Sequence, residues 1–245
     1  MNKQIINKKK ILIEVKSIKK DYGRGKKKFT AIENLSFNIY ENENVSIVGA
    51  NGAGKTTTVE IMMGITKPTS GRIIYNFGKK KDNINKMLGI QFQDSIYPSY
   101  ISVKSIINFI IDSYKINITD DELGSLVKAF KVDGFYNKDA SSLSGGQSQR
   151  LNIFLALLHK PKVVFLDELS TGLDITTRNE FKLFIKKYAS ENRITIILIS
   201  HDANEIISLT DRILILKKGE IKNDKKINEF KNANELEKYI GENIN

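Results

Sequence analysis

The sequence predicts an α/β fold in which a parallel sheet is preceded by an antiparallel β layer and interrupted by a helical insertion. Three observations predict it. Short apolar runs rich in β-branched residues, at 45–48, 163–166 and 194–199, are typical of buried parallel strands and alternate with helical segments. Before the first of them, short alternating segments are separated by polar loops. From residue 95 to about residue 140, helical spacing replaces the strand pattern.

The first parallel strand leads into a phosphate-binding loop. Residues 45–58 are V-S-I-V-G-A-N-G-A-G-K-T-T-T, and residues 49–56 fit the pattern G-x-x-x-x-G-K-[ST]. Glycines let the backbone turn tightly and bring its N–H groups against the β- and γ-phosphates, while the following helix, to about Gly64, points its positive N-terminus at them. The strand–loop–helix context disfavours an ordinary glycine-rich turn, so the expected core is that of a P-loop NTPase (RecA-like).

The loop and the start of its helix supply the expected nucleotide contacts. Lys55 adds a positive charge near the phosphates, and the Thr56 hydroxyl can ligate Mg²⁺. The complete set of expected contacts in this stretch is Gly49, Ala50, Asn51, Gly52, Ala53, Gly54, Lys55, Thr56 and Thr57.

The composition limits the class of protein. The chain has 245 residues and no cysteine, which excludes disulfides and thiolate metal sites and fits the cytosol. No apolar run approaches the roughly 18 residues that a membrane-spanning helix needs. The N-terminus lacks an apolar segment long enough for a secretory signal. We therefore expect a protein that is soluble by itself.

The net charge of +11 is concentrated at the N-terminus, where residues 1–30 hold eleven Lys or Arg against Glu14 and Asp21. Such a segment could bind nucleic acid or an anionic membrane surface. We favour a solvated edge, because Lys is abundant throughout the chain and no interleaved aromatic residues suggest a stacking platform for single strands. No specific nucleic-acid partner is expected.

The antiparallel layer is expected to contain strands at 11–15, 29–32 and 35–39, with polar loops between them. Tyr22 stands in the turn after the first strand. An exposed aromatic ring there could stack on an adenine, although a packing or turn residue is the plainer alternative.

Beyond the loop helix, strands are expected at 72–76 and 88–92, the second ending in Gln93-Asp94. Helices are expected at 103–111 and 123–130, and residues 119–122, Thr-Asp-Asp-Glu, form a capping signal before the second helix.

A second possible phosphate contact lies at residues 141–150, S-S-L-S-G-G-Q-S-Q-R, before a largely apolar helix. Ser144 and two glycines stand at a helix start, where backbone N–H groups can hold a phosphate. Without further context this is only a capped helix N-terminus. His159 ends the same helix and is expected to cap it.

Polar residues follow two of the buried strands at their carboxyl ends, where ligands bind in open α/β sheets. Asp167 suits coordination of Mg²⁺ through water, and Glu168 suits polarisation of an attacking water. His201 follows the strand expected at 194–199, where its side chain could reach a γ-phosphate. Asp167 and Glu168 could instead be two surface acids in a strand-to-loop turn. Because the chain also contains a phosphate-binding loop, we favour the functional interpretation. The chain is expected to close with a turn at 170–174, a helix to about residue 189, a hairpin across Lys218-Gly219 and an amphipathic helix at 227–240.

Together these residues resemble the ATP-binding subunit of an ABC transporter, over nearly the whole chain and in the family's order. The matching segments are 49–56 (Walker A), Gln93 (Q-loop), 143–147 (the signature L-S-G-G-Q), 163–168 (Walker B), 170–174 (D-loop), His201 (switch histidine) and Tyr22 (adenine-stacking aromatic).

The resemblance implies a mechanism. Two subunits would pair head to tail, so that each ATP lies between the Walker A loop of one chain and the signature motif of the other. Glu168 would be the general base and His201 a γ-phosphate contact, and Gln93 would sense the site and report to the helical insertion. The implied partner-facing nucleotide contacts are Ser144, Gly145, Gly146, Gln147 and Asp174, and the implied Mg²⁺ ligands are Thr56, Gln93 and Asp167.

The resemblance also implies one ATPase domain over 1–245, with a core at 1–94 and 160–245 and a helical subdomain at 95–159. The implied partners are ATP, a second ATP-binding subunit and a transmembrane permease, which place the chain peripherally at the cytoplasmic face of the cell membrane. Since every active-site element is intact, hydrolysis is expected rather than nucleotide binding alone.

The sequence departs from the family pattern at Leu169, where proline is usual, and at Ser148, where a longer polar residue is common. The T-G-L-D form of the D-loop and Tyr97-Pro98 resemble the drug- and lipid-export branch, so an exporter is expected. A soluble relative working in cluster assembly, translation or DNA maintenance is the alternative. Co-purification with a membrane protein would separate the two classes.

Overall fold

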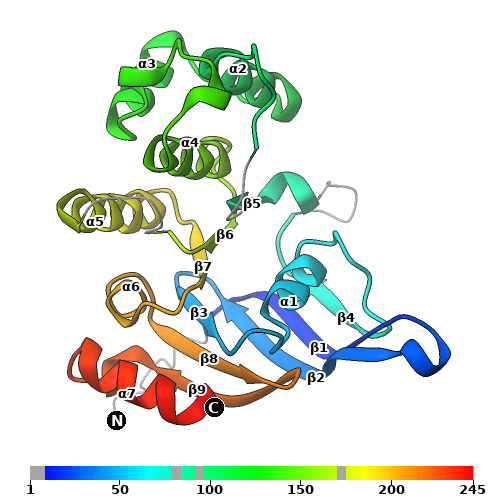
Figure 1. Ribbon diagram of the computed structural model, residues 1–245. Helices are drawn as coiled ribbons and strands as arrows, with labels where there is room; N and C mark the ends of the chain where they lie inside the picture. Colours follow the sequence, from blue (N-terminus) through cyan, green and yellow to red (C-terminus); the bar gives the residue numbers. More distant parts are fainter. Residues whose placement is uncertain (1–8, 79–83, 92–95, 170–174, 245) are drawn as a thin grey trace, which may run out of the picture.

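The computed structural model describes residues 9–78, 84–91, 96–169 and 175–244 of the chain (Figure 1). Within them, nine strands form one mixed sheet in the order β4-β1-β2-β9-β8-β3-β7-β6-β5. The strands are β1 (Ile11–Tyr22), β2 (Phe29–Tyr40), β3 (Val45–Val48), β4 (Ser70–Tyr75), β5 (Leu88–Gln91), β6 (Val163–Asp167), β7 (Thr195–Ile199), β8 (Arg212–Lys217) and β9 (Glu220–Lys226). The helices are α1 (Lys55–Met62), α2 (Val103–Tyr114), α3 (Asp120–Ala129), α4 (Gly145–Leu158), α5 (Ile175–Glu191), α6 (Ala203–Leu209) and α7 (Ala233–Ile244).

The two faces of the sheet bury separate hydrophobic cores, as the two-residue period of a strand requires. Along β6, Val164 and Leu166 join one core, whereas Val163 and Phe165 join the other. The first core also contains residues of α2 to α7, and the second contains α1 and the strands β1 and β2. The predicted α/β class is therefore confirmed. None of the helices in the described ranges is long and apolar enough to cross a membrane.

The antiparallel layer contains longer strands than the sequence predicts. The strand expected at 11–15 continues to Tyr22, and the two expected at 29–32 and 35–39 are one strand, β2. The register between β1 and β2 shifts at four places, two with an extra residue in β1 and two with an extra residue in β2, as at β-bulges. At two of these shifts, two successive side chains face solvent, Lys16 with Ser17 and Glu33 with Asn34. These pairs interrupt the alternation on which the predicted boundaries depended.

Helices α2 and α3 are present where the sequence predicts them, and Thr119 and Glu122 form the expected capping box before α3. The predicted terminal helix at 227–240 is wrong at its start. Residues 227–229 form one turn of 3-10 helix, and α7 begins later because the Asn232 side chain accepts a hydrogen bond from the Glu235 N–H at 3.0 Å.

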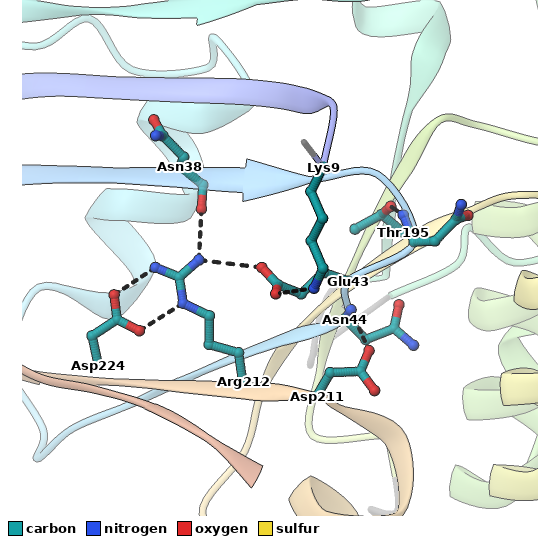
Figure 2. A network of polar contacts seen from close by, with 9 residues as sticks. Lys9, Asn38, Glu43, Asn44, Thr195, Asp211, Arg212 and Asp224 are labelled. Atoms are coloured by element: carbon teal, nitrogen blue, oxygen red, sulfur yellow. Dashed lines mark hydrogen bonds and ion pairs between the residues drawn. The ribbon is translucent and has the colours of Figure 1, made fainter. Parts of the chain in front are cut away.

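A network of ion pairs closes the end of the sheet where β3 and β8 begin (Figure 2). Arg212 Nε donates to Asp224 Oδ1 at 2.6 Å, and Arg212 Nη1 donates to the Asn38 carbonyl at 3.0 Å and to Glu43 Oε2 at 3.3 Å. Lys9 Nζ reaches the other Glu43 oxygen at 2.7 Å. Only 13% of the Arg212 side chain and 8% of the Glu43 side chain are exposed, so the centre of this network is desolvated and joins β2, β8 and β9 to the segment before β3.

Much of the basic charge in the described part of the N-terminal segment is neutralised by neighbouring acids. The pairs are Lys9–Glu43, Lys10–Glu41, Lys16–Glu14, Lys19–Glu33 and Lys28–Asp21. This pairing favours the interpretation of the segment as a solvated, charge-balanced edge of the sheet.

Candidate nucleotide site

The loop at residues 49–54 follows β3, which lies between β7 and β8 in the middle of the sheet. A side chain at Gly49 would place its Cβ 2.4 Å from the Leu216 carbonyl oxygen. Gly54 has a φ of +100°, and a Cβ there would lie 2.7 Å from the Ala31 carbonyl oxygen. Both positions therefore require glycine. Helix α1 begins directly after Gly54, which has no side chain to cap it, so the N–H groups of its first turn are available to an anion.

The Lys55 side chain folds back onto the loop that precedes it. Its Nζ donates to the carbonyl oxygens of Gly49 at 2.6 Å and Ala50 at 3.2 Å. Burial lowers the pKa of Lys55, while the negative charges of Asp167 and Glu168 raise it. Lys55 is thus near both carboxylates as well as the loop.

The carboxylates stand at the carboxyl end of β6. Burial raises the pKa of Asp167, and the charge of Glu168 raises it further, while Lys55 lowers it. Glu168 has a φ of +50°, a left-handed conformation that side chains other than glycine rarely adopt. Its N–H donates to the Ile199 carbonyl at 2.9 Å, which joins the turn after β6 to the end of β7.

His201 follows β7 and is exposed to solvent. Burial of part of the ring and the positive charge of Lys55 lower the pKa of His201, whereas the charge of Glu168 raises it. The structure therefore brings together Lys55, Asp167, Glu168 and His201, which stand at or after the carboxyl ends of the neighbouring parallel strands β3, β6 and β7. The other histidine, His159, is structural: it is the C-cap residue of α4 and its Nε2 lies 3.1 Å from the Leu88 carbonyl oxygen.

The donor set suits Mg²⁺ bound together with a nucleotide. Mg²⁺ usually keeps several waters and takes only one or two protein oxygens besides substrate phosphates. Thr56, exposed at the start of α1, and Asp167 supply a hydroxyl and a carboxylate of that kind. The described residues contain no cluster of three or more His, Cys, Asp or Glu suited to a resident ion. Two predicted site residues, Gln93 and Asp174, lie outside the described residues.

Tyr22 is the last residue of β1, the neighbour of strand β2. Strand β2 approaches the phosphate loop, because the Ile32 side chain lies 3.5 Å from the Cβ position built on Gly54. Tyr22 is 40% exposed, and Lys20 Nζ lies 4.8 Å from the ring centroid. The ring is therefore an accessible aromatic surface on the strand next to the one that contacts the loop.

If Tyr22 stacks on adenine, Tyr22→Ala raises the ATP dissociation constant roughly ten- to hundredfold, because base–aromatic stacking contributes about 1–3 kcal/mol. Tyr22→Phe and Tyr22→Trp retain affinity, since stacking needs only the ring face. Phe29→Ala is the matched control, because Phe29 is the cross-strand partner of Tyr22 and is 58% exposed. Equal ATP affinity of Tyr22→Ala and wild type in calorimetric titrations would show that the ring only packs.

The predicted partner-facing residues form the start of α4. Ser144 Oγ accepts from the Gln147 N–H at 3.3 Å, and the Gln147 side chain accepts from the Ser144 N–H at 3.2 Å. Ser144 and Gly145 are exposed, and nothing lies within 4 Å of a Cβ built on Gly145. In Figure 1, α4 lies with α2 and α3, separated from α1 by strands β5 to β7. The structure therefore does not bring these residues to the chain's own phosphate loop.

The sequence interpretation missed two buried glutamines behind the carboxylates. Gln149 Nε2 donates to the carbonyl oxygens of Glu168 at 3.1 Å and Leu169 at 3.2 Å, and Gln91 Oε1 accepts from the Asp167 N–H at 2.9 Å. Gln149 is the second residue after the signature segment, but nothing in its spacing predicts contact with residues of the Walker B segment. Leu169, in place of the usual proline, is fully buried in the core.

Comparison with known proteins identifies the family. A family model described as ABC transporter matches residues 32–171. The energy-coupling factor transporter ATP-binding protein EcfA1 of Oenococcus oeni is 35% identical over 234 residues, covering 92% of this chain and 83% of its own length. The spermidine/putrescine import ATP-binding protein PotA of Clostridium novyi is 32% identical, covering 94% of this chain. The chain spans 67% of the length of that PotA and 60% of the PotA of Mesoplasma florum.

A solved structure with a similar fold is that of the ATP-binding cassette MJ0796, a dimer in a post-hydrolysis state with ADP and Pi. Its sequence is 28% identical to this chain, and the TM-score is 0.77. The match covers 88% of this chain and 99% of MJ0796. The expected likeness to the drug- and lipid-export branch is not supported, because these relatives carry the names of import and energy-coupling factor proteins. The form of the D-loop and Tyr97-Pro98 are therefore poor guides to the branch. The chain belongs to the ABC transporter family, as one of its ATP-binding and ATP-hydrolysing domains.

Proposed function

We propose that the chain hydrolyses Mg-ATP with Glu168 as general base, and that it is the motor subunit of a membrane transporter. The observation that carries the proposal is the convergence of Lys55, Asp167, Glu168 and His201 at the carboxyl ends of the adjacent parallel strands β3, β7 and β6, where the Glu168 N–H also bonds to the end of β7. In this arrangement the loop N–H groups and Lys55 hold the β- and γ-phosphates, and Thr56 and Asp167 hold Mg²⁺, with Gln93 as a further proposed ligand. Mg²⁺ supplies charge neutralisation on the transferred phosphoryl group.

Glu168 is proposed to orient a water molecule and accept its proton as that water attacks the γ-phosphorus. His201 is proposed to contact the γ-phosphate. Partial burial and the positive charge of Lys55 lower the pKa of His201, which favours the neutral ring, and a neutral ring can donate one hydrogen bond.

The other half of each site is proposed to come from a second ATP-binding chain. The exposed start of α4 lies apart from α1, so Ser144, Gly145, Gly146 and Gln147 can serve a nucleotide bound by a partner. Asp174 is proposed to contribute to the same interface. The dimeric form of the similar cassette MJ0796 supports this arrangement.

A transmembrane permease is proposed to dock on the helical part of the chain, the proposed subdomain at 95–159. Large apolar side chains are exposed on this part and on the loop after α1: Ile65 at 57%, Ile96 at 95%, Tyr100 at 97% and Phe109 at 68%. Exposed apolar residues of this size favour a protein partner. Since the PotA relatives are named for import, we propose inward transport and a peripheral location at the cytoplasmic face of the membrane.

Lys55→Ala tests the nucleotide assignment. The variant loses a charge-assisted contact to phosphate, worth about 1.5–3 kcal/mol, so its ATP dissociation constant rises roughly ten- to hundredfold and the protein stays monomeric with ATP. Titration calorimetry and gel filtration with nucleotide measure the two effects.

Lys104→Ala is the matched control for the lost charge, because Lys104 is an exposed lysine on α2. It leaves nucleotide affinity and assembly unchanged. Unaltered ATP affinity of Lys55→Ala would mean that the loop does not hold the phosphates in the way proposed.

A further inference from the structure

The turn that carries Glu168 is held by a side chain from another element. Gln149, on the second turn of α4, is only 5% exposed. Its Nε2 lies 3.1 Å from the Glu168 carbonyl oxygen and 3.2 Å from the Leu169 carbonyl oxygen. Because carbonyl oxygens only accept hydrogen bonds, the group that faces them must be the donating NH₂. The two N–H groups of the Gln149 amide can therefore donate one hydrogen bond to each of the two carbonyl oxygens.

The same orientation turns Gln149 Oε1 toward Gln91, whose Nε2 lies 3.4 Å away. Gln91 is 1% exposed, and its own Oε1 accepts from the Asp167 N–H at 2.9 Å. Two buried amides thus connect α4 and β5 to backbone groups of three consecutive residues, Asp167, Glu168 and Leu169. The helix that supplies Gln149 is fixed in place, because it approaches β5 so closely that a Cβ on Gly89 would lie 2.2 Å from the Ala156 carbonyl oxygen.

The turn needs such support because its backbone is strained. Glu168 has a φ of +50°, which costs on the order of 1 kcal/mol or more for a residue with a side chain, and the surrounding contacts must maintain it. Leu169 lacks the ring that would fix φ at this position. The two hydrogen bonds from Gln149 hold the Glu168–Leu169 peptide and the peptide that follows it, one on each side of the Leu169 Cα, and restrict the rotation of both peptides.

We propose that Gln149 is a positioning residue for hydrolysis, which holds the peptide of Glu168 so that its carboxylate faces the water beside the chain's own nucleotide. The inference rests on the proposed role of Glu168 as general base. It also assigns a link between two sites, because α4 begins with the residues proposed to serve the partner's nucleotide and carries Gln149 one turn later. Occupation of the partner's site can therefore bias the position of Glu168 in this chain.

Gln149→Met tests the inference, since methionine has a similar length and no donor. A small misplacement of a reacting group costs as much as about 100-fold in rate, so we expect kcat to fall roughly ten- to hundredfold with unchanged ATP affinity. Because hydrolysis is proposed to open the dimer, the ATP-bound dimer of this variant is expected to persist longer than that of the wild type. Asn152→Leu is the matched control. Asn152 is also buried on α4 and bonds to the Tyr97 hydroxyl, away from Glu168, so its loss leaves kcat unchanged. Gln149→Leu replaces Gln149→Met if methionine prevents folding.

A double-mutant cycle with Glu168→Gln separates positioning from general damage. If Gln149 acts through Glu168, adding Gln149→Met to Glu168→Gln causes no further fall in the residual rate. The same fall in both backgrounds, or a wild-type kcat for Gln149→Met alone, would overturn the inference while leaving the role of Glu168 intact. A wild-type rate for Glu168→Gln alone would instead overturn the proposed function.

Discussion

Glu168→Gln is expected to slow ATP hydrolysis by about 10²- to 10⁴-fold, the usual contribution of a general base. The amide keeps the size of the carboxylate and can still hydrogen-bond water, but it cannot accept a proton at neutral pH. Lys55, Thr56 and Asp167 are unchanged, so the variant still binds Mg-ATP. Since hydrolysis is proposed to open the head-to-tail pair, we expect this variant to accumulate as an ATP-bound dimer.

Gel filtration with and without ATP measures this dimer, and a coupled assay measures the hydrolysis rate. The isolated subunit is tested at high protein concentration, because we expect it to dimerise weakly without the proposed membrane partner. Lys55→Ala serves as the opposite control, since it is expected to stay monomeric. Hydrolysis by Glu168→Gln at near the wild-type rate would show that Glu168 is not the base.

Arg212→Ala is expected to lower the free energy of unfolding by about 3 kcal/mol, because it leaves the buried Glu43 carboxylate with one fewer cation in the network of Figure 2. This loss of stability is at the low end of the range expected when one partner of a buried ion pair is removed, because Lys9 still contacts Glu43. Urea denaturation followed by circular dichroism measures the change. In a domain of this size it corresponds to a fall of roughly 6–12 °C in Tm.

Lys187→Ala is the matched control, because the Lys187–Glu191 pair has side chains that are 76% and 60% exposed. Exposed pairs of this kind contribute about 0.3–0.5 kcal/mol, so the control is nearly as stable as wild type. An Arg212→Ala variant that unfolds at the wild-type urea concentration would mean that solvent, rather than Arg212, already compensates the Glu43 charge.

The elements that the sequence predicts best are those with an uninterrupted local signal. The strand β3 is a continuous buried run, and α3 carries its own capping box at Thr119 and Glu122. The boundaries of β1 and β2 could not be predicted, because a β-bulge is a property of the pairing between two strands. The exposed pair Glu33-Asn34 resembles a loop in the sequence and is part of a strand in the structure.

The candidate site likewise has a part that the sequence predicts and a part that it does not. The phosphate loop is contiguous, and Asp167 and His201 each follow a recognisable strand, so their meeting at one edge follows from the parallel topology. The contact of Gln149 with the Glu168 carbonyl depends instead on how closely α4 packs against β5, and the Gln91–Asp167 bond joins residues 76 positions apart. No local pattern in the sequence encodes either contact.

The central place of β3 in the sheet determines when the nucleotide site can form during synthesis. Val45 pairs with Ile197 in β7 and with Arg212 in β8, so β3 has neither neighbour until the last quarter of the chain has left the ribosome. At about 5–20 residues per second, that delay is roughly 10–30 s. Helices α2 to α4, whose hydrogen bonds are local, can form in the meantime. The apolar strand that leads into the phosphate loop is therefore the part of the nascent protein most exposed to premature association.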